Sequence, residues 1–154
     1  CTVLELEHSL TPVYWLNIAD PTMPFGGLIE HTNYIPKERS GGRHILYISN
    51  YLFPDHPLFH APKKEVIAAY LPALTRVNSA FDPSWIVKSH HFRAEYAQPV
   101  VPVGYRKRIP PFRQSVRGLY LCTMAQIFPE DRGQNYAVAY GEKVARTMLK
   151  DIGP

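Results

Sequence analysis

Proline is the residue that most constrains what this chain can fold into. Fifteen of the 154 residues are prolines, and they cluster between the segments that have a regular hydrophobic pattern. Because proline has a fixed φ angle and no backbone N–H, it interrupts helices and the hydrogen-bonded ladders of sheets. Hydrophobic residues make up 45% of the chain and charged residues 19%, which is ordinary for one globular domain with a core. The sequence therefore favours short strands and stiff loops over a helical bundle.

Alternation of apolar and polar residues predicts four strands in the first third of the chain. Turn residues such as Pro12, Asp20 and Pro24 separate them. The predicted strands are residues 2–7, 13–18, 25–34 and 44–52. Because their connections are short, they indicate an antiparallel meander.

The hydrophobic period changes to a helical one after Pro62, a residue suited to a helix start. The apolar stripe that should lie on the sheet consists of Val66, Ile67, Tyr70, Leu71 and Leu74. Pro72 falls inside this stripe and predicts a kink or two short helices. A long extended segment is expected over residues 85–98. The predicted fold class is α+β: an antiparallel, mostly meandering sheet with one or two helices packed on a face, plus a C-terminal strand-loop-helix.

Residues 118–149 have the pattern of that C-terminal unit. An apolar strand at 119–123, with a buried thiol at Cys122, leads to a polar loop at 129–133 and then a helix. The helix carries small residues at spacing four, namely Ala137, Gly141 and Ala145, so one of its faces can approach another element closely. The first N–H groups of such a helix lack internal partners, and they predict an anion or cofactor site.

This stretch resembles the C-terminal flavin-contacting segment of the FAD-dependent amine oxidase and protoporphyrinogen oxidase superfamily. The matching residues are Leu119-Tyr120-Leu121, Pro129 to Asn135, Ala137 to Gly141, and Ala145. The segments 24–34, 44–52 and 97–105 also resemble the substrate domain of these oxidoreductases. The resemblance implies a substrate-binding-like α+β domain at residues 1–117. Residues 118–154 are then a strand-loop-helix that completes the FAD-binding domain of the full-length protein.

The dinucleotide-binding signature of that family is missing from this sequence. No GxGxxG motif occurs, and the pairs Gly26-Gly27 and Gly41-Gly42 are typical of turns. The chain begins at Cys1 without an initiator Met, and we interpret it as a C-terminal fragment of a longer flavoprotein. Its expected partner is the missing N-terminal dinucleotide-binding domain, with a homodimer formed by swapping as a further possibility. FAD is expected in the full-length protein and not on this fragment alone.

The resemblance also implies which residues form the site. The sheet is expected to form one wall of the substrate pocket, through Tyr34, Tyr47, Tyr51, His91 and Arg93. The flavin side is expected to be lined by Arg132, Gly133, Gln134 and Asn135, with Gly133 adopting backbone angles closed to other residues and leaving room for the ring. In such enzymes the cofactor carries the hydride chemistry, so no catalytic side chain is assigned. The predicted function is the C-terminal substrate-domain part of an FAD-dependent oxidoreductase that transfers a hydride from an organic substrate to flavin, inactive alone.

Two alternatives remain open. A relative in the same fold isomerises nucleotide sugars, as UDP-galactopyranose mutases do, and it needs an arginine-rich pocket for a diphosphate. The basic residues around Tyr105 and Phe112 are the candidates: Arg106, Lys107, Arg108, Arg113 and Arg117. Most such clusters are solvated loops, and contact with nucleic acid or a membrane surface is the minor interpretation. The other alternative is a non-enzymatic α+β binding module without a cofactor.

Other chemistry finds little support in the sequence. His90 and His91 are neighbours in a predicted strand and so point to opposite faces, while prolines disrupt the helical spacing of His56 and His60. We therefore expect no metal. Neither a G-x-S-x-G elbow, a signal peptide nor an apolar run of membrane-spanning length is visible, and a cytoplasmic protein that binds no nucleic acid is expected. Glu30 with His31, and Asp55 with His56, are possible polar pairs.

Overall fold

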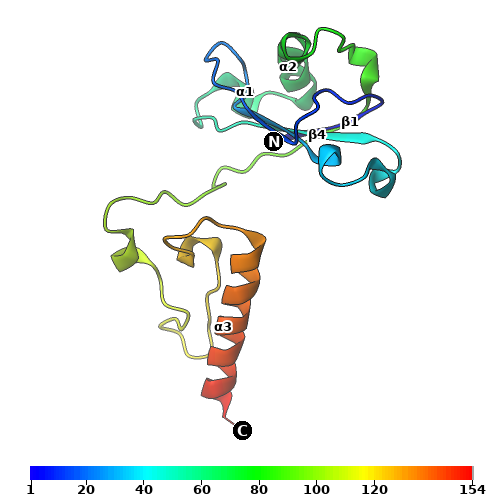
Figure 1. The fold of residues 1–154 in the computed structure, drawn as a ribbon. Coiled ribbons are helices and arrows are strands. Elements are labelled where there is room, and N and C mark those ends of the chain that lie inside the picture. Colours follow the sequence, from blue (N-terminus) through cyan, green and yellow to red (C-terminus); the bar gives the residue numbers. More distant parts are fainter. Residues whose placement is uncertain (154) are drawn as a thin grey trace. The chain divides into compact units, whose positions relative to one another are not determined.

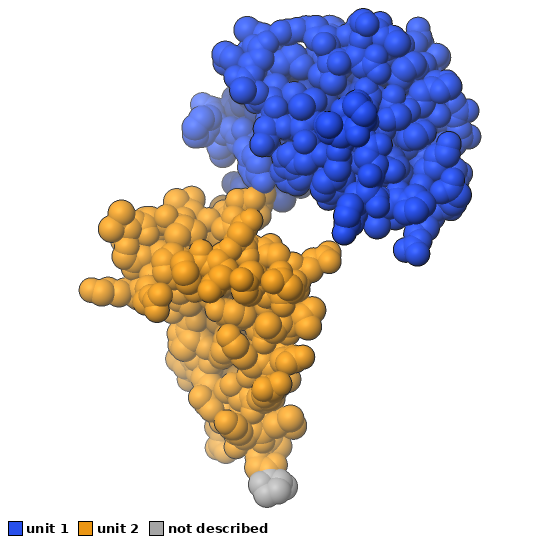
Figure 2. Space-filling view, viewed as in Figure 1, with its two compact units in different colours: residues 1–95 blue, residues 96–154 orange. Residues whose placement is uncertain are grey.

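The computed structural model describes residues 1–153, which form two compact units. Unit 1 comprises residues 1–95 and unit 2 comprises residues 96–154 (Figure 2). The division expected from the sequence lay at residue 117, but residues 96–117 contact the C-terminal segment. The Tyr105 hydroxyl donates to the Ala125 carbonyl at 2.7 Å, and the Gln126 amide donates to the Pro110 carbonyl at 3.0 Å. Pro154, the last residue of the predicted C-terminal segment, lies outside the described residues.

The sheet of unit 1 has five strands, and every pairing is antiparallel. The strands are β1 (Thr2–Leu6), β2 (Trp15–Asn17), β3 (Gly27–Glu30), β4 (His44–Ser49) and β5 (Ile86–His91). Their order is β2-β3-β4-β1-β5, so the predicted meander holds for β2, β3 and β4. The first strand instead lies between β4 and β5. The strand predicted at residues 25–34 ends early, because the 3-10 turn η1 (His31–Asn33) follows β3 directly.

The helices of unit 1 lie on one face of this sheet (Figure 1). They are α1 (Pro57–His60) and α2 (Lys63–Val77), with the short 3-10 turns η2 (Lys37–Ser40) and η3 (Pro83–Trp85) elsewhere in the unit. The core joins the inward side chains of the strands to the apolar stripe of α2. Its fully buried members include Leu4, Leu6, Leu28, Leu46, Ile48, Val66 and Leu74. The α+β class predicted from the sequence is confirmed.

Pro72 does not divide α2 into two helices. A single helix runs from Lys63 to Val77 with Pro72 inside it. Proline removes the bond that its N–H would give to the carbonyl of Ala68, and both residues are exposed. Because water can solvate that carbonyl, the helix continues through the proline.

Unit 2 consists of two 3-10 turns, connecting loops and one long helix. These are η4 (Tyr105–Arg108), η5 (Met124–Gln126) and α3 (Gln134–Ile152). The strand predicted at residues 119–123 is wrong: that segment makes an isolated bridge between Arg113 and Tyr120. Cys122 is consequently exposed instead of buried.

Helix α3 is held along one side only. The rings of Phe112 and Tyr140 meet edge to face at 5.9 Å, and the Asp151 carboxylate binds both Arg113 and the Tyr120 hydroxyl. Along its 19 residues, Val144 is the one buried side chain. The predicted stripe of Ala137, Gly141 and Ala145 is exposed, and a Cβ on Gly141 would meet nothing within 4 Å.

Candidate functional site

The N-terminus of α3 carries the residues predicted to contact a cofactor. Gly133 is the N-cap residue, and no side chain caps the helix there. The N–H groups of Tyr136 and Ala137 both donate to the Gly133 carbonyl, at 3.1 Å each. Within residues 1–153 the N–H groups of Gln134 and Asn135 meet no acceptor. Two donors are therefore available at the positive end of the helix dipole.

The loop before α3 is fixed by its own polar groups. The Arg132 N–H donates to Asp131 Oδ1 at 2.8 Å, and the Gly133 N–H donates to the Asp131 carbonyl at 2.9 Å. The Arg132 guanidinium donates to Gln98 Oε1 at 2.7 Å. Arg132 thus positions the loop, and its guanidinium is directed toward the start of unit 2.

Space, and not the backbone angles, is what favours glycine at position 133. Its φ of −88° and ψ of 163° are open to any L-residue, so the expectation of restricted angles is wrong. A Cβ at this position would instead collide with Oδ1 of Asn135. That amide lies at the end of a short side chain, which can turn away. A side chain at position 133 would then occupy the space in front of the helix N-terminus.

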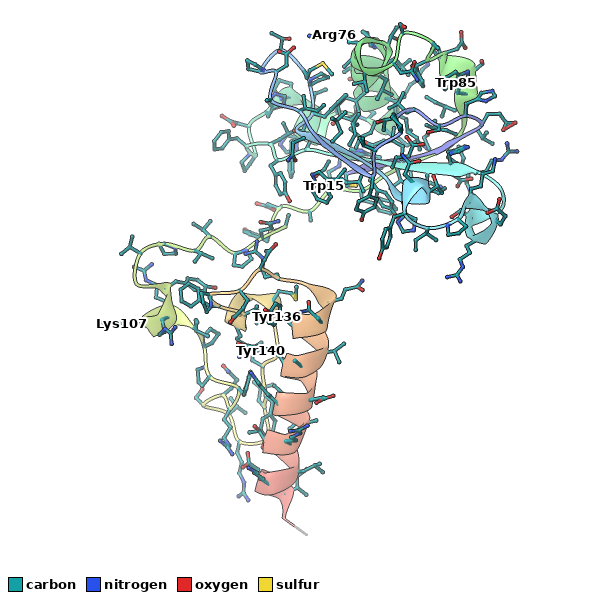
Figure 3. The ribbon with its side chains drawn as sticks, viewed as in Figure 1. Trp15, Arg76, Trp85, Lys107, Tyr136 and Tyr140 are labelled. Carbon is teal, nitrogen blue, oxygen red and sulfur yellow. The ribbon has the colours of Figure 1, made fainter. Side chains whose placement is uncertain are left out.

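The face of the sheet opposite α2 forms a second candidate surface, here called the outer face. Residues alternate along each strand, so the pairing register decides which side chains share it. Val3 pairs with Tyr47 on one side and with His90 on the other, and Tyr47 also pairs with Ile29. By this register the outer face contains Val3, Glu5, Trp15, Asn17, Ile29, Ile45, Tyr47, Lys88 and His90, and Lys88 Nζ lies 3.9 Å from Glu5 Oε1. Figure 3 shows Trp15 on the side of the sheet opposite Arg76.

The five residues predicted to line the substrate pocket do not share this face. Tyr47 lies on it, but His91 pairs with Thr2 and points to the α2 side of the sheet. Tyr34 follows η1, is 73% exposed and lies 5.4 Å from the Tyr14 ring. Tyr51 follows β4 and is 72% exposed. The strand register therefore does not place all five residues on a single wall.

Arg93 and His91 are both engaged within unit 1. The Arg93 guanidinium donates to the carbonyls of Phe59 and Ala61 at 2.8 and 3.3 Å, so it ties α1 to the end of β5. His91 Nδ1 lies 2.9 Å from the Thr2 hydroxyl. Burial lowers the pKa of His91, and the nearby positive charges of the chain's N-terminal amine, Arg93 and Lys63 lower it further. These effects favour the neutral form of the His91 imidazole.

The outer face has a polar pair that the sequence did not single out. His90 Nε2 lies 3.1 Å from Glu5 Oε1, and its ring stacks on Phe92 at 6.4 Å with an angle of 10° between the planes. A half-buried imidazole beside a carboxylate can exchange a proton with a bound molecule. Residue types identified two adjacent histidines. Which of them shares a face with Tyr47 depends on the register, which no local pattern encodes.

Unit 1 also contains a cleft of about 340 Å³. Its lining is mostly apolar and comprises Ile18, Asp20, Pro21, Met23, Pro24, Phe25, Gly26, Asn50, Leu52, His56 and Leu58. The Asn50 amide donates to the Pro24 carbonyl at 2.6 Å, and so joins the end of β4 to the loop before β3. Hydrogen bonds from Thr22 lower the pKa of Asp20, as does the Arg76 guanidinium 2.5 Å away. None of the residues predicted for the substrate pocket lines this cleft.

Glu30 lies beside His44, and not beside His31 as the sequence suggested. Its side chain is fully buried, and Oε2 accepts from the N–H groups of Leu10 and Thr11 at 3.1 and 2.8 Å. Oε1 lies 3.6 Å from Nδ1 of His44. His31, the neighbour in sequence, faces Tyr47 instead, with ring centroids 6.1 Å apart.

Two findings bound the remaining chemistry. Among residues 1–153 no three His, Cys, Asp or Glu side chains come together as a metal site. In that same part of the chain, no helix combines the length and the apolar character needed to cross a bilayer.

Comparisons with protein-family models, with curated proteins and with solved structures give no match to this chain.

Proposed function

We propose that this chain is the substrate domain and flavin-contacting segment of an FAD-dependent oxidoreductase of the amine oxidase and protoporphyrinogen oxidase type. In this proposal, unit 1 supplies part of the substrate pocket, and the start of α3 contacts the flavin. The dinucleotide-binding domain that holds the rest of FAD is a separate part of the same protein. The chain alone is inactive.

The observation that carries the proposal is the incomplete packing of α3. The helix is 19 residues long and buries only Val144, while the side bearing Gly141 meets nothing within 4 Å. A helix of this length in a globular protein normally buries an apolar stripe. Small side chains on the exposed side allow close approach of another element, which is what a covering dinucleotide-binding domain requires. The sequence resemblance of this same segment supports the choice of that partner.

The residues at the start of α3 fit the pyrimidine edge of a flavin. The N–H groups of Gln134 and Asn135 are unclaimed donors, and the side chain that a ring would have to displace beside Gly133 is that of Asn135. Donors fixed on a helix can stabilise negative charge without reorganising. When bound, flavin accepts a hydride and becomes more negative at that edge. This chain has no GxGxxG to hold the ADP half, so the fit is limited to the ring.

The outer face supports the substrate side of the proposal. Tyr47 and Ile29 offer an apolar surface, and Glu5 with His90 offers a polar pair beside it. A mostly apolar wall with few polar groups is typical of pockets for organic molecules. The histidine and carboxylate can orient a substrate or hold a proton. Of the residues predicted from sequence, Tyr47 is the one that this surface retains in a strand.

The nucleotide-sugar alternative has less support. Its diphosphate needs arginines that converge in a pocket, and the lining of the 340 Å³ cleft contains none. In unit 2, Arg113 is already bound to Asp151 by two hydrogen bonds of 2.7 and 2.8 Å. The binding-module alternative predicts that the complete gene encodes no GxGxxG unit. The test uses this difference.

The test compares this chain with the product of its complete gene. The complete sequence should contain an N-terminal GxGxxG unit, and its purified product should carry FAD with a flavin absorption band near one equivalent. The present chain, mixed with FAD and desalted, should show no such band, because an exposed helix N-terminus contributes only about 0.3–1 kcal/mol toward an anion. A complete gene without that unit, or a flavin-free product, would favour a binding module. Stoichiometric FAD on the present chain would contradict the proposal that a separate domain is needed to hold the cofactor.

A further inference from the structure

Positive charge is concentrated in unit 2. The whole chain has 17 Lys and Arg residues, 13 Asp and Glu residues and a formal charge of +4. Unit 2 holds nine of those cations and four of those carboxylates, a charge of +5, whereas unit 1 holds eight cations and nine carboxylates, a charge of −1. The chain is therefore close to neutral in one unit and strongly basic in the other.

Most of this charge lies in residues 100–117, here called the basic segment. Arg113 is bound to Asp151, but the other four cations form no ion pair among residues 1–153. These four are Arg106, Lys107, Arg108 and Arg117, and all are exposed. Figure 3 shows Lys107 on η4, well away from Tyr136 and Tyr140 of α3. The basic segment thus presents unpaired cations to its surroundings.

The same segment exposes aliphatic side chains. Val100 is 85% exposed, Val103 is fully exposed, and Val116 is 62% exposed. Single exposed apolar residues are common, but here Val100 and Val103 precede the cations of η4, and Val116 precedes Arg117, so exposed apolar and cationic side chains occur together in one segment. Its charge is complementary to an anionic surface whose interior is apolar.

The aromatic residues of the segment are not available for a ligand. Tyr105 is buried and donates to Ala125, Phe112 packs on Tyr140, and Phe128, which lies under the Arg106 guanidinium at 5.7 Å, contacts Tyr105. Single-stranded nucleic acids bind basic grooves largely by stacking bases on exposed aromatic rings. Because Tyr105 is buried and the half-buried rings of Phe112 and Phe128 pack on other rings, the segment favours a lipid surface over nucleic acid.

We propose that the basic segment attaches this protein to the surface of anionic membranes. Arg106, Lys107, Arg108 and Arg117 contact lipid phosphate and carboxylate groups, and the valines enter the boundary between headgroups and acyl chains. The turn at residues 105–108 is fixed at both its start and its base. Gly104 begins it with a φ of 79°, and Tyr105 anchors it in unit 2. The contact is peripheral, and it is independent of the flavin assignment.

The test is sedimentation of the full chain with vesicles. The chain should bind vesicles of three parts phosphatidylcholine to one part phosphatidylserine and not vesicles of phosphatidylcholine alone. The triple variant Arg106→Gln, Lys107→Gln, Arg108→Gln should bind about 100-fold more weakly. A matched variant with Lys37→Gln, Arg39→Gln and Lys64→Gln removes the same charge from exposed, unpaired cations of unit 1 and should bind as the unchanged chain does.

A second variant tests the apolar half of the contact. Val100→Ser with Val103→Ser keeps all charges and should weaken vesicle binding severalfold, while circular dichroism stays unchanged because both side chains are exposed. Equal binding by the two triple variants would overturn the proposal, since the effect would then be one of net charge. Binding to a single-stranded oligonucleotide or to UDP-glucose, without binding to anionic vesicles, would also overturn it and assign the segment to phosphate groups of another source.

Discussion

Oε1 of Glu30 lies 3.6 Å from Nδ1 of His44, and neither atom has a hydrogen-bond partner among residues 1–153. The other carboxylate oxygen receives the N–H groups of Leu10 and Thr11. Glu30 is thus a buried side chain that orders the chain between β1 and β2. Glu30 is the last residue of β3 and lies beside the first residue of β4. Its hydrogen bonds to the two N–H groups explain why a charged residue occurs at this apolar end of the strand.

Glu30→Ala should lower the free energy of unfolding by about 3 kcal/mol, because it leaves two buried N–H groups without an acceptor. Urea unfolding followed by circular dichroism measures this change. Glu38→Ala, in the exposed turn η2, is the matched control and should change the free energy by less than about 0.5 kcal/mol. An unfolding midpoint shared by both variants would show that Glu30 is not the acceptor that orders this loop.

Asp151 fixes the C-terminal end of α3 and gives unit 2 a pH dependence. Hydrogen bonds from Arg113 and the Tyr120 hydroxyl lower the pKa of Asp151 from 3.8 to about 2. Because the folded pKa is the lower one, the stabilisation is complete above pH 4 and is lost as the pH falls from about 4 through 2. Carbon NMR of the carboxyl group should give a midpoint near 2.

Substitution of Asp151 tests the same contacts with Arg113 and Tyr120. Asp151→Asn should remove the acid-dependent part of amide exchange protection in the last turns of α3. Glu142→Gln, whose partner is Arg146 on the exposed surface of the same helix, should not. Equal protection for Asp151→Asn and the unchanged chain between pH 4 and 2 would contradict the assignment.

Several elements followed from local pattern, because local pattern is what determines them. The alternation at residues 44–49 and the helical stripe from Val66 to Leu74 both appear at the predicted places, since burial on one face imposes those periods. The position of β1 between β4 and β5 was not predicted, because it depends on contacts between residues far apart in sequence. Cys122 was misassigned for the same reason: an apolar run forms a strand only where another strand pairs with it.

Of the candidate site, the sequence predicted where α3 begins and not which strand residues share a face. The start of α3 was identified because helix-start residues act locally, and the structure gives it at Gly133. The substrate wall was not, since a choice between His90 and His91 requires the strand register. The reason given for Gly133 was wrong: the sequence suggests glycine's backbone freedom, whereas the angles at Gly133 are open to any L-residue and a Cβ there would only displace the end of the Asn135 side chain.

Gly141 tests the contact proposed between α3 and a dinucleotide-binding domain. Gly141→Ala should stabilise the present chain by about 0.5–1 kcal/mol, because the position is exposed, helical and free of neighbours. Gly141→Leu should also leave the chain folded, yet in the proposed flavoprotein it should prevent packing against the dinucleotide-binding domain and so lower the flavin content. Lys150→Leu adds the same side chain elsewhere on the helix and is the control. Equal flavin content in both leucine variants would mean that no close contact exists at Gly141.

Gly133→Val tests the space before α3. The backbone angles at Gly133 suit valine, so the circular dichroism of the chain should not change. In the proposed flavoprotein the branched side chain should fill the space in front of the helix and reduce the flavin content after desalting. Gly133→Ala should have a smaller effect. Full flavin content in Gly133→Val would show that no ring lies near this residue.

Gln134→Pro removes one proposed donor without removing the helix. Proline is favoured at the first helical position, and the extended angles of Gly133 are those that a residue before proline prefers. In the proposed flavoprotein the flavin should still bind, but its reduced form should lose one hydrogen bond. A donor aimed at developing charge contributes roughly 3 kcal/mol in an excluded site, so the two-electron midpoint potential should fall by about 60 mV.

Equilibrium titration against a redox dye measures this potential without a known substrate. Gln134→Ala is the control, because it removes the side chain and keeps the N–H group, and its potential should match that of the unchanged protein. The comparison isolates one backbone hydrogen. A potential that is the same in the proline and alanine variants would mean that the N–H of residue 134 faces something other than the ring, and the start of α3 would then be an ordinary helix end.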